Sequence, residues 1–498
     1  MENKAKISLV GLILMIFSSI YGFANTPPIA FAQMGYASII WYIFAAIIFF
    51  LPSGLMFAEY GAAFKESHGG FYSWLSESVG DRYAFVGTFI WLSTWVIWMV
   101  STSSKVWIPL STLIFGSDQT QNWHFLGLTS VQTVGLLALC WMILVTFFTT
   151  RGVKSIARIA SIGGGVFVMV LTGIFFVSSI ILLIVNHGEL QQPIHGISSF
   201  VKSPPNPQFG SPIAVMSFVV YAIFAYAGME SMSGLVDDLD QPEKTFPKGI
   251  MFAAFFITIF YSLSIFLWGI NTNWTKVISG DNVTLGNVTY VLMNNLGNFF
   301  GHSLGLSNST SAMIGSLLSR FTGLSMFFAY CGSFFILTYS PLKSFIMGSP
   351  KELWPKRMTK LNKAGMPAFA MWLQAGIVAV FILLIAFGGA GGAQKFYLIL
   401  TDMGNISTSV PFLFLIGAFP FFKKKQNIER PFVAYKNPII TNLIVTVILI
   451  VISLGIIFTA LQPILAHDYV TAFWTIMGPL FFGSVALIFY SFRSGKNK

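Results

Sequence analysis

Long apolar segments recur along almost the whole chain and are separated by short polar connections. Each segment is about 20 residues or longer, the length at which an α-helix crosses a bilayer, and too long for a barrel strand. The pattern therefore predicts an all-α polytopic membrane protein. We expect twelve transmembrane helices, at about residues 7–31, 38–64, 83–109, 126–149, 157–185, 212–236, 248–270, 317–345, 367–388, 395–421, 437–461 and 470–492.

Small and polar residues interrupt two of these segments. The first segment contains residues 17–23 (FSSIYGF) and the sixth contains residues 224–230 (FAYAGME). Lipid penalises unpaired backbone groups and charges, so such interruptions are typical of broken helices that surround a substrate site near the bilayer midplane. Close helix packing through small residues is the structural alternative.

The spacing of the two interruptions predicts the topology. Five spans separate them, so helices 1 and 6 cross the bilayer in opposite directions, as in a five-plus-five inverted repeat. We expect one transmembrane domain over residues 1–492 and a short cytoplasmic tail over 493–498. Its parts are helices 1–5 (about 7–185), helices 6–10 (about 212–421) and an accessory pair, helices 11–12 (about 437–492). The longest connection, about 271–316, is expected to be an external loop.

Composition and charge agree with this class. Hydrophobic residues make up 55% of the chain and charged residues 9%, which excludes a sizeable water-soluble domain. Most of the 28 Lys and Arg residues fall on the predicted inner side, so the net charge of +11 reflects membrane topology with both termini cytoplasmic. We expect no nucleic-acid partner. The two cysteines lie within predicted spans and indicate no disulfide framework.

The interruptions have the chemistry needed to hold a zwitterion. Unwinding near Ser18–Gly22 would free amides for a carboxylate, with the serine hydroxyls as further donors. Unwinding near Ala225–Gly228 would free carbonyls for an ammonium group, and glycines permit such backbone. The predicted substrate-binding residues are Ser18, Ser19, Ile20, Tyr21, Gly22, Phe224, Ala225, Tyr226, Ala227 and Gly228.

Five further residues are candidates for coupling or gating. Glu230 is a carboxylate within a predicted span; it either holds the broken helix 6 through hydrogen bonds, or relays a proton or senses the substrate. Trp98 and Thr102 line a cavity or only pack within helix 3. Lys105 reaches the interface by default, and a pair with Asp402 forming an outer gate is the alternative hypothesis.

The chain also resembles the amino acid–polyamine–organocation superfamily, specifically its glutamate/GABA-antiporter-like branch. The resemblance covers nearly the whole chain and rests on an ordered set of motifs. These are Ala58-Glu59-Tyr60-Gly61, Gly69-Gly70-Phe71-Tyr72-Ser73-Trp74, Val79-Gly80-Asp81-Arg82, residues 151–159 (RGVKSIARI), residues 226–231 (YAGMES), residues 240–247 (DQPEKTFP), Tyr339-Ser340-Pro341, residues 353–356 (LWPK) and residues 362–367 (NKAGMP).

The resemblance implies a LeuT-like fold and alternating-access transport of amino acids or related amines across the cytoplasmic membrane, with antiport as the first reading. Proton-coupled symport is the second reading, and a non-transporting amino acid receptor is a further alternative. The chain departs from some proton-coupled members in having no lysine in the middle of helix 5. We expect no enzymatic activity, no metal and no cofactor. The expected partners are a small-molecule substrate and membrane lipid, and a homo-oligomer is compatible with these features.

Overall fold

The computed structural model describes residues 8–23, 25–64, 71–152, 154–201, 205–228, 239, 241–388 and 391–494. The regular elements of these residues are helices, which confirms the predicted all-α class. They are α1 (Leu9–Ile20), α2 (Pro27–Met34), α3 (Ala37–Ala45), η1 (Ala46–Phe50), α4 (Leu51–Ala63), α5 (Phe71–Val79), α6 (Asp81–Lys105), α7 (Trp107–Phe115), η2 (Thr120–Asn122), α8 (Ser130–Thr150), α9 (Lys154–Val185), α10 (Ser198–Val201), η3 (Pro207–Phe209), α11 (Pro212–Phe224), α12 (Pro242–Asn271), α13 (Trp274–Val277), α14 (Val288–Ser303), α15 (Asn308–Leu337), α16 (Ser340–Gly348), η5 (Lys351–Leu353), α17 (Lys356–Thr359), α18 (Ala368–Phe387), α19 (Ala393–Lys424), α20 (Pro438–Leu465) and α21 (Tyr469–Ser494).

Ten helical segments of the described chain are long and apolar enough to cross a bilayer. They are Ala37–Ala63, Asp81–Phe115, Ser130–Thr150, Ile162–Val185, Lys244–Asn271, Asn308–Gly348, Ala368–Phe387, Ala393–Lys424, Pro438–Leu465 and Tyr469–Phe492. The other two predicted spans, 7–31 and 212–236, contain the interrupted segments. The first is divided into α1 and α2, and α11 ends after 13 residues. None of these pieces reaches the length of about 20 residues that a single helix needs to cross the bilayer, so the total of twelve transmembrane helices stays a prediction.

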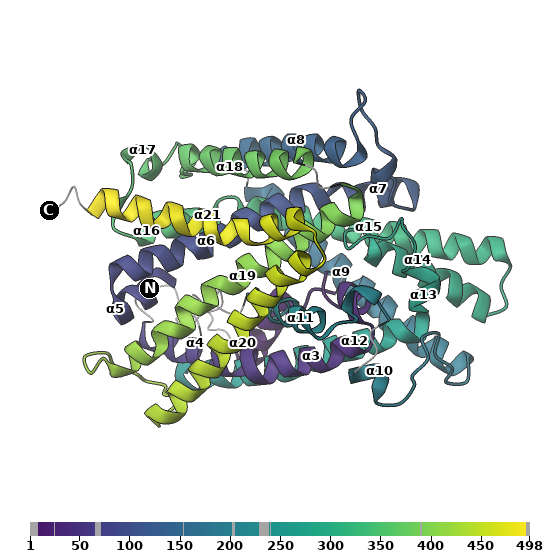
Figure 1. Cartoon of the computed structure of the whole chain (residues 1–498), viewed down its shortest axis with the longest axis horizontal. Helices are drawn as coiled ribbons and strands as arrows, with labels where there is room; N and C mark the ends of the chain where they lie inside the picture. Colours follow the sequence, from purple (N-terminus) through teal and green to yellow (C-terminus); the bar gives the residue numbers. More distant parts are fainter. Residues whose placement is uncertain are drawn as a thin grey trace.

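The helical bundle has two distinct ends. Helices α5 and α17 and the end of α21 lie at one end, whereas α13 and α14 lie at the opposite end (Figure 1). The connection from α19 to α20, which carries Lys425 and Arg430, also lies at the first end. We call this first end the basic end and the opposite one the vestibule end.

Large apolar side chains cover much of the outer surface of the bundle. Ile184 on α9 is 70% exposed, Ile439 on α20 is 77% exposed and Phe492 on α21 is 73% exposed. Such side chains on a soluble protein would form extensive apolar patches, whereas here they can face lipid. The exposed apolar surface therefore agrees with a bilayer around the bundle.

Inside the bundle, glycines allow helices to approach closely. A Cβ atom at Gly164 on α9 would lie 2.6 Å from the backbone of Ala329 on α15. A Cβ atom at Gly323 on α15 would lie 2.6 Å from the carbonyl oxygen of Pro109 on α7. Both contacts are shorter than a side chain permits, so these glycines set the packing of α15 against α9 and α7.

The connection predicted as a loop at 271–316 is instead partly helical. It contains α13 and the four-turn helix α14, which packs against α15. Leu292, Met293 and Leu296 on α14 are fully buried. Asparagines interrupt the apolar positions of α14 in the sequence, and contacts with α15, α2 and α9 bury these positions.

Candidate functional site

The first helix break lies one turn later than the sequence indicated. Helix α1 continues through Ile20, because the N–H of Tyr21 still donates to the carbonyl of Phe17 at 2.8 Å. Ser18 and Ser19 therefore belong to the last turn of α1 and not to the unwound segment, which begins at Tyr21 and ends where Pro27 starts α2. A proline at the first helical position has a preset φ angle and favours this start.

The break also offers fewer free amides than expected for a carboxylate. Pro27 and Pro28 have no N–H, so the first two positions of α2 provide no donor. The N–H groups of Asn25 and Thr26 both donate to the carbonyl of Gly22, at 3.2 and 3.0 Å. The donors that the sequence assigned to this half-helix are thus largely used within the break itself.

The second break follows α11. This helix ends at Phe224, and the chain continues as a turn over residues 225–228, in which the N–H of Tyr226 donates to the carbonyl of Ile223. Gly228 has a φ angle of +112°, which side chains other than hydrogen rarely permit. The interruption predicted here is confirmed at this position. Glu230, the candidate carboxylate of this segment, lies outside the described residues.

One phenol joins the two breaks. The hydroxyl of Tyr261 on α12 lies 2.7 Å from the carbonyl oxygen of Ile20 and 2.9 Å from that of Ala225. Tyr261 is fully buried. A hydroxyl has one hydrogen and cannot donate fully to both oxygens at once, so the two carbonyls compete for it. The ends of α1 and α11, far apart in sequence, therefore meet at one shared hydroxyl.

A pocket of about 970 Å³ lies at the vestibule end, and we call it the vestibule. Its walls come from α11, α19 and α20 and from the segments around η3 and α13. Its polar lining includes Gln33, Gln208, Ser217, Lys395, Asp402 and Asn405. Lys395 forms an ion pair with Asp468 at 2.7 Å, and both side chains are about one-third exposed.

Tyr221 separates the vestibule from the first break. It lines the vestibule, and its hydroxyl lies 3.0 Å from the carbonyl oxygen of Asn25 and 3.1 Å from that of Thr26. On the other side, Tyr330 of α15 donates to the side-chain oxygen of Asn25 at 2.8 Å. Tyr221 therefore joins the wall of the vestibule to the unwound part of helix 1 through hydrogen bonds.

The alternative hypothesis of an ion pair between Lys105 and Asp402 does not correspond to a contact within 4.0 Å in this structure. Among the described side chains, the ion pairs within 4.0 Å are Lys395–Asp468 and Lys423–Glu59. The Lys105 ammonium donates to the hydroxyl of Thr401 at 3.2 Å instead. Asp402 is the next residue on α19 and lines the vestibule, so the two charges are neighbours without being partners.

The remaining predicted residues are mostly packed. Tyr226 is fully buried, and its hydroxyl contacts the carbonyl of Tyr42 and the hydroxyl of Thr258, each at 3.1 Å. Tyr21 is turned toward α12, where its hydroxyl lies 2.8 Å from that of Ser264. The Trp98 ring packs on Phe334, with the ring centres 5.1 Å apart. Phe224 and Ala227 are half-buried and Thr102 is buried, whereas the side chains of Ser18 and Ser19 lie outside the described part of the chain.

Several residues of the site carried no signal in the sequence. Tyr221 and Tyr261 stand in continuous apolar runs, where aromatic residues are common and a hydroxyl has no visible purpose. Gln33 is an amide in the apolar helix α2; it is 5% exposed, lines the vestibule and its side-chain oxygen has no protein partner among the described atoms. Gln33 is therefore the exception among these residues, because an amide within an apolar helix indicates a polar surface such as the vestibule.

Residues 7–483, almost the whole chain, match the family model described as amino acid permease. The chain belongs to this family. The match confirms the resemblance to the amino acid–polyamine–organocation superfamily that the ordered motifs indicated. As an amino acid permease, the chain is a membrane transporter rather than an enzyme, and its substrate is a small molecule.

Named relatives of this permease support the same assignment. The inner membrane transporter YjeM of Salmonella typhimurium is 51% identical over 492 residues, which cover 99% of this chain and 97% of that protein. YjeM of Escherichia coli is 51% identical over 486 residues, or 97% and 96% of the two chains. A glutamate/gamma-aminobutyrate antiporter of Lactococcus lactis is 23% identical over 431 residues, or 86% and 78%. Together with the ten apolar helices, these relatives identify a multi-pass protein of the cytoplasmic membrane.

Proposed function

We propose that this permease exchanges amino acids or related amines by alternating access, with the cargo bound between the two helix breaks. The observation that carries the proposal is the meeting of the Ile20 and Ala225 carbonyls at the Tyr261 hydroxyl. Each carbonyl oxygen can accept two hydrogen bonds, so an ammonium group that enters between the breaks would find two acceptors at this point. Antiport is favoured over symport by the likeness to the glutamate/gamma-aminobutyrate antiporter.

The vestibule supports this proposal as an entry route. Its polar lining leads from the partly exposed pair Lys395–Asp468 to Tyr221, which contacts the first break directly. Rearrangement of the Tyr221 hydrogen bonds would connect the vestibule with the space between the breaks. The carboxylate of Asp402 would attract the ammonium group on the way.

The proposed topology follows from charge and order. With twelve spans and the positive-inside rule, the basic end faces the cytoplasm and the vestibule faces outward. Helices 1–5 and 6–10 would then form the two halves of a LeuT-like inverted repeat, each beginning with a broken helix.

The experiment is uptake of labelled amino acids and amines into proteoliposomes that are preloaded with each candidate, with and without a pH gradient. Antiport requires that uptake depends on an internal substrate, whereas a symporter driven by protons accumulates cargo from the gradient alone. Failure of every preload and every gradient to drive uptake would overturn the proposed transport function. Tyr261→Phe serves as the site variant, because it removes the shared hydroxyl and keeps the ring.

A further inference from the structure

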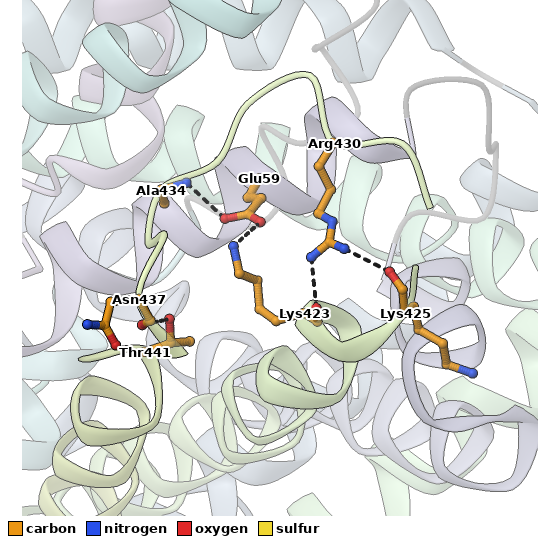
Figure 2. Close-up of polar contacts among 7 residues, drawn as sticks. All are labelled: Glu59, Lys423, Lys425, Arg430, Ala434, Asn437 and Thr441. Carbon is orange, nitrogen blue, oxygen red and sulfur yellow. Dashed lines mark hydrogen bonds and ion pairs between the residues drawn. The ribbon is translucent and has the colours of Figure 1, made fainter. Parts of the chain in front are cut away.

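The basic end contains a buried ion pair that the vestibule and the two breaks do not involve. Glu59, in the Ala58-Glu59-Tyr60-Gly61 motif of α4, has a fully buried side chain. One carboxylate oxygen lies 2.6 Å from the ammonium of Lys423, and the other accepts the backbone N–H of Ala434 at 2.9 Å (Figure 2). Both oxygens of the carboxylate are therefore occupied by groups from the far half of the chain.

These partners belong to the end of α19 and to the connection that follows it. Lys423 stands in the last turn of α19, and Arg430 donates to the carbonyls of Lys423 and Lys425 at 3.0 and 2.8 Å (Figure 2). These bonds satisfy carbonyls that the helix end leaves free and fold residues 425–437 back over it. Ala434 is thereby presented to Glu59, so the carboxylate holds both the helix and its following connection.

A second contact joins the same elements. The hydroxyl of Tyr435 lies 3.2 Å from the carbonyl oxygen of Pro52 on α4. Burial, together with the nearby Glu59 carboxylate, raises the pKa of Tyr435 to about 12, so its hydroxyl keeps its proton at neutral pH. Helix α4 is thus connected to the 425–437 segment at two points, Pro52 and Glu59.

The charge pairs at the two ends of the molecule differ in their environment. Lys395 and Asp468 beside the vestibule are 33% and 29% exposed, whereas Lys423 is 16% exposed and Glu59 is 0% exposed. Removing one member of a buried pair leaves an uncompensated charge, which is far more costly than the loss of a surface pair. The pair at the basic end can separate only if water or another polar group takes over its hydrogen bonds.

We propose that Glu59 and Lys423 form the gate that keeps the basic end closed while the vestibule is open. This inference rests on the proposed alternating access, because release at the basic end requires α4 and α19 to separate there. Opening transfers the carboxylate from Lys423 and Ala434 to water, and closing restores both contacts. The gate therefore sets the balance between the two orientations, while the cargo contacts lie elsewhere.

Hydrogen exchange of the purified full-length protein tests the gate without measuring transport. Glu59→Gln and Lys423→Met each leave one charge of the pair unpaired, and we expect the amides of residues 425–437 to exchange at least about tenfold faster in either variant. The double variant Glu59→Gln/Lys423→Met leaves neither charge buried and should exchange no faster than the single variants. Glu77→Gln and Lys424→Met, at exposed positions of α5 and α19, are matched controls.

Two outcomes would overturn the gate: unchanged exchange in the pair variants, or equal acceleration in the matched controls. If Glu59→Gln does not fold, Lys423→Met at the partly exposed partner answers the same question. A second measurement uses Met56→Cys, fully buried one turn before Glu59, in a chain with Cys140 and Cys331 replaced by alanine. Its labelling by a maleimide should rise at least about fivefold with Lys423→Met, because opening admits water to α4.

Failure of the gate and failure of the proposed transport function remain distinguishable. A wild-type protein that exchanges no cargo in proteoliposomes contradicts the transport proposal, whatever its hydrogen exchange. Normal wild-type transport combined with unchanged exchange in the pair variants contradicts the gate alone. Lys423→Arg retains the charge and should keep both transport and slow exchange.

Discussion

The hydroxyl of Tyr261 lies 2.9 Å from the carbonyl oxygen of Ala225, at the point where α11 stops being a helix. The same hydroxyl lies 2.7 Å from the carbonyl of Ile20, at the corresponding end of α1. Backbone carbonyls at a helix end within a membrane need a partner, and lipid provides none. Tyr261 therefore stabilises two interruptions that would otherwise be costly, while leaving acceptor capacity for a cargo ammonium group.

Tyr261→Phe is expected to reduce transport at least tenfold, since it leaves both carbonyls without this donor. The free energy of unfolding should fall by about 1–3 kcal/mol, the usual effect of an unsatisfied buried polar group. The control is Tyr83→Phe, which removes a hydroxyl that donates to the Phe414 carbonyl at 3.0 Å, away from the breaks. Thermal unfolding and proteoliposome uptake measure the two effects. Equal loss of transport in both variants would show that the hydroxyl at the breaks has no special role.

Gly228→Ala is expected to disturb the second break, because a φ angle of +112° is strained for alanine. The strain costs about 1–3 kcal/mol or displaces the turn, and either result should lower transport more than thermal stability. Gly173→Ala is the matched control, since a Cβ atom there meets no other atom within 4 Å. Its transport rate and melting temperature should stay close to those of the wild type. Normal transport by Gly228→Ala would contradict the assignment of this turn to the substrate site.

Asp402→Asn tests the role of the vestibule carboxylate. Removing the charge should raise KM for amine-bearing cargo by about tenfold and change the maximal rate less, because the attraction acts before the cargo reaches the breaks. Uptake kinetics at several ionic strengths measure the effect. Asp281→Asn changes an exposed carboxylate outside the vestibule lining and should leave KM unchanged. A variant of Asp402 that alters only the maximal rate would favour a role in the conformational cycle.

The pair Lys395–Asp468 should make the free energy of unfolding decrease as the pH falls into the acidic range. Burial raises the pKa of Asp468, but hydrogen bonds from Lys395 and Thr471 outweigh it and leave the pKa below the ordinary value. When folding lowers the pKa of a carboxyl, its charged form stabilises the folded state at pH values above the unfolded pKa of about 3.9. This stabilisation is lost as the pH falls through the lower pKa of the folded state. Thermal unfolding between neutral and acidic pH measures this contribution.

For this partly exposed pair we expect at most about 1 kcal/mol at neutral pH. Asp468→Asn should therefore lower the melting temperature slightly at pH 7 and make no difference at the lowest pH. Glu189→Gln changes an exposed carboxylate between α9 and α10 and is the control. Its melting temperature should depend on pH in the same way as that of the wild type. A larger loss for Asp468→Asn at low pH than at neutral pH would contradict the argument.

The sequence by itself determined the class of the protein and the location of its site along the chain. The length of the apolar runs is a local property, so it predicted the spans, and the small residues near Gly22 and Gly228 predicted both breaks. It misplaced the first break by about one turn, because Ser18 and Ser19 tolerate a helical backbone and the prolines at 27 and 28 define the restart. It also missed α14, whose stability comes from packing on α15.

Only the tertiary structure decided which side chains meet. Tyr261 and Ala225 are 36 positions apart, Tyr221 and Thr26 are 195 apart, and Glu59 and Lys423 are 364 apart. Periodicity reports which face of a helix is apolar, but it does not report which neighbour that face contacts. The alternative pairing of Lys105 with Asp402 illustrates this limit, since packing directs the lysine to Thr401. Helix packing, and not the local pattern, determines the hydrogen-bond partners from which the site and the gate are built.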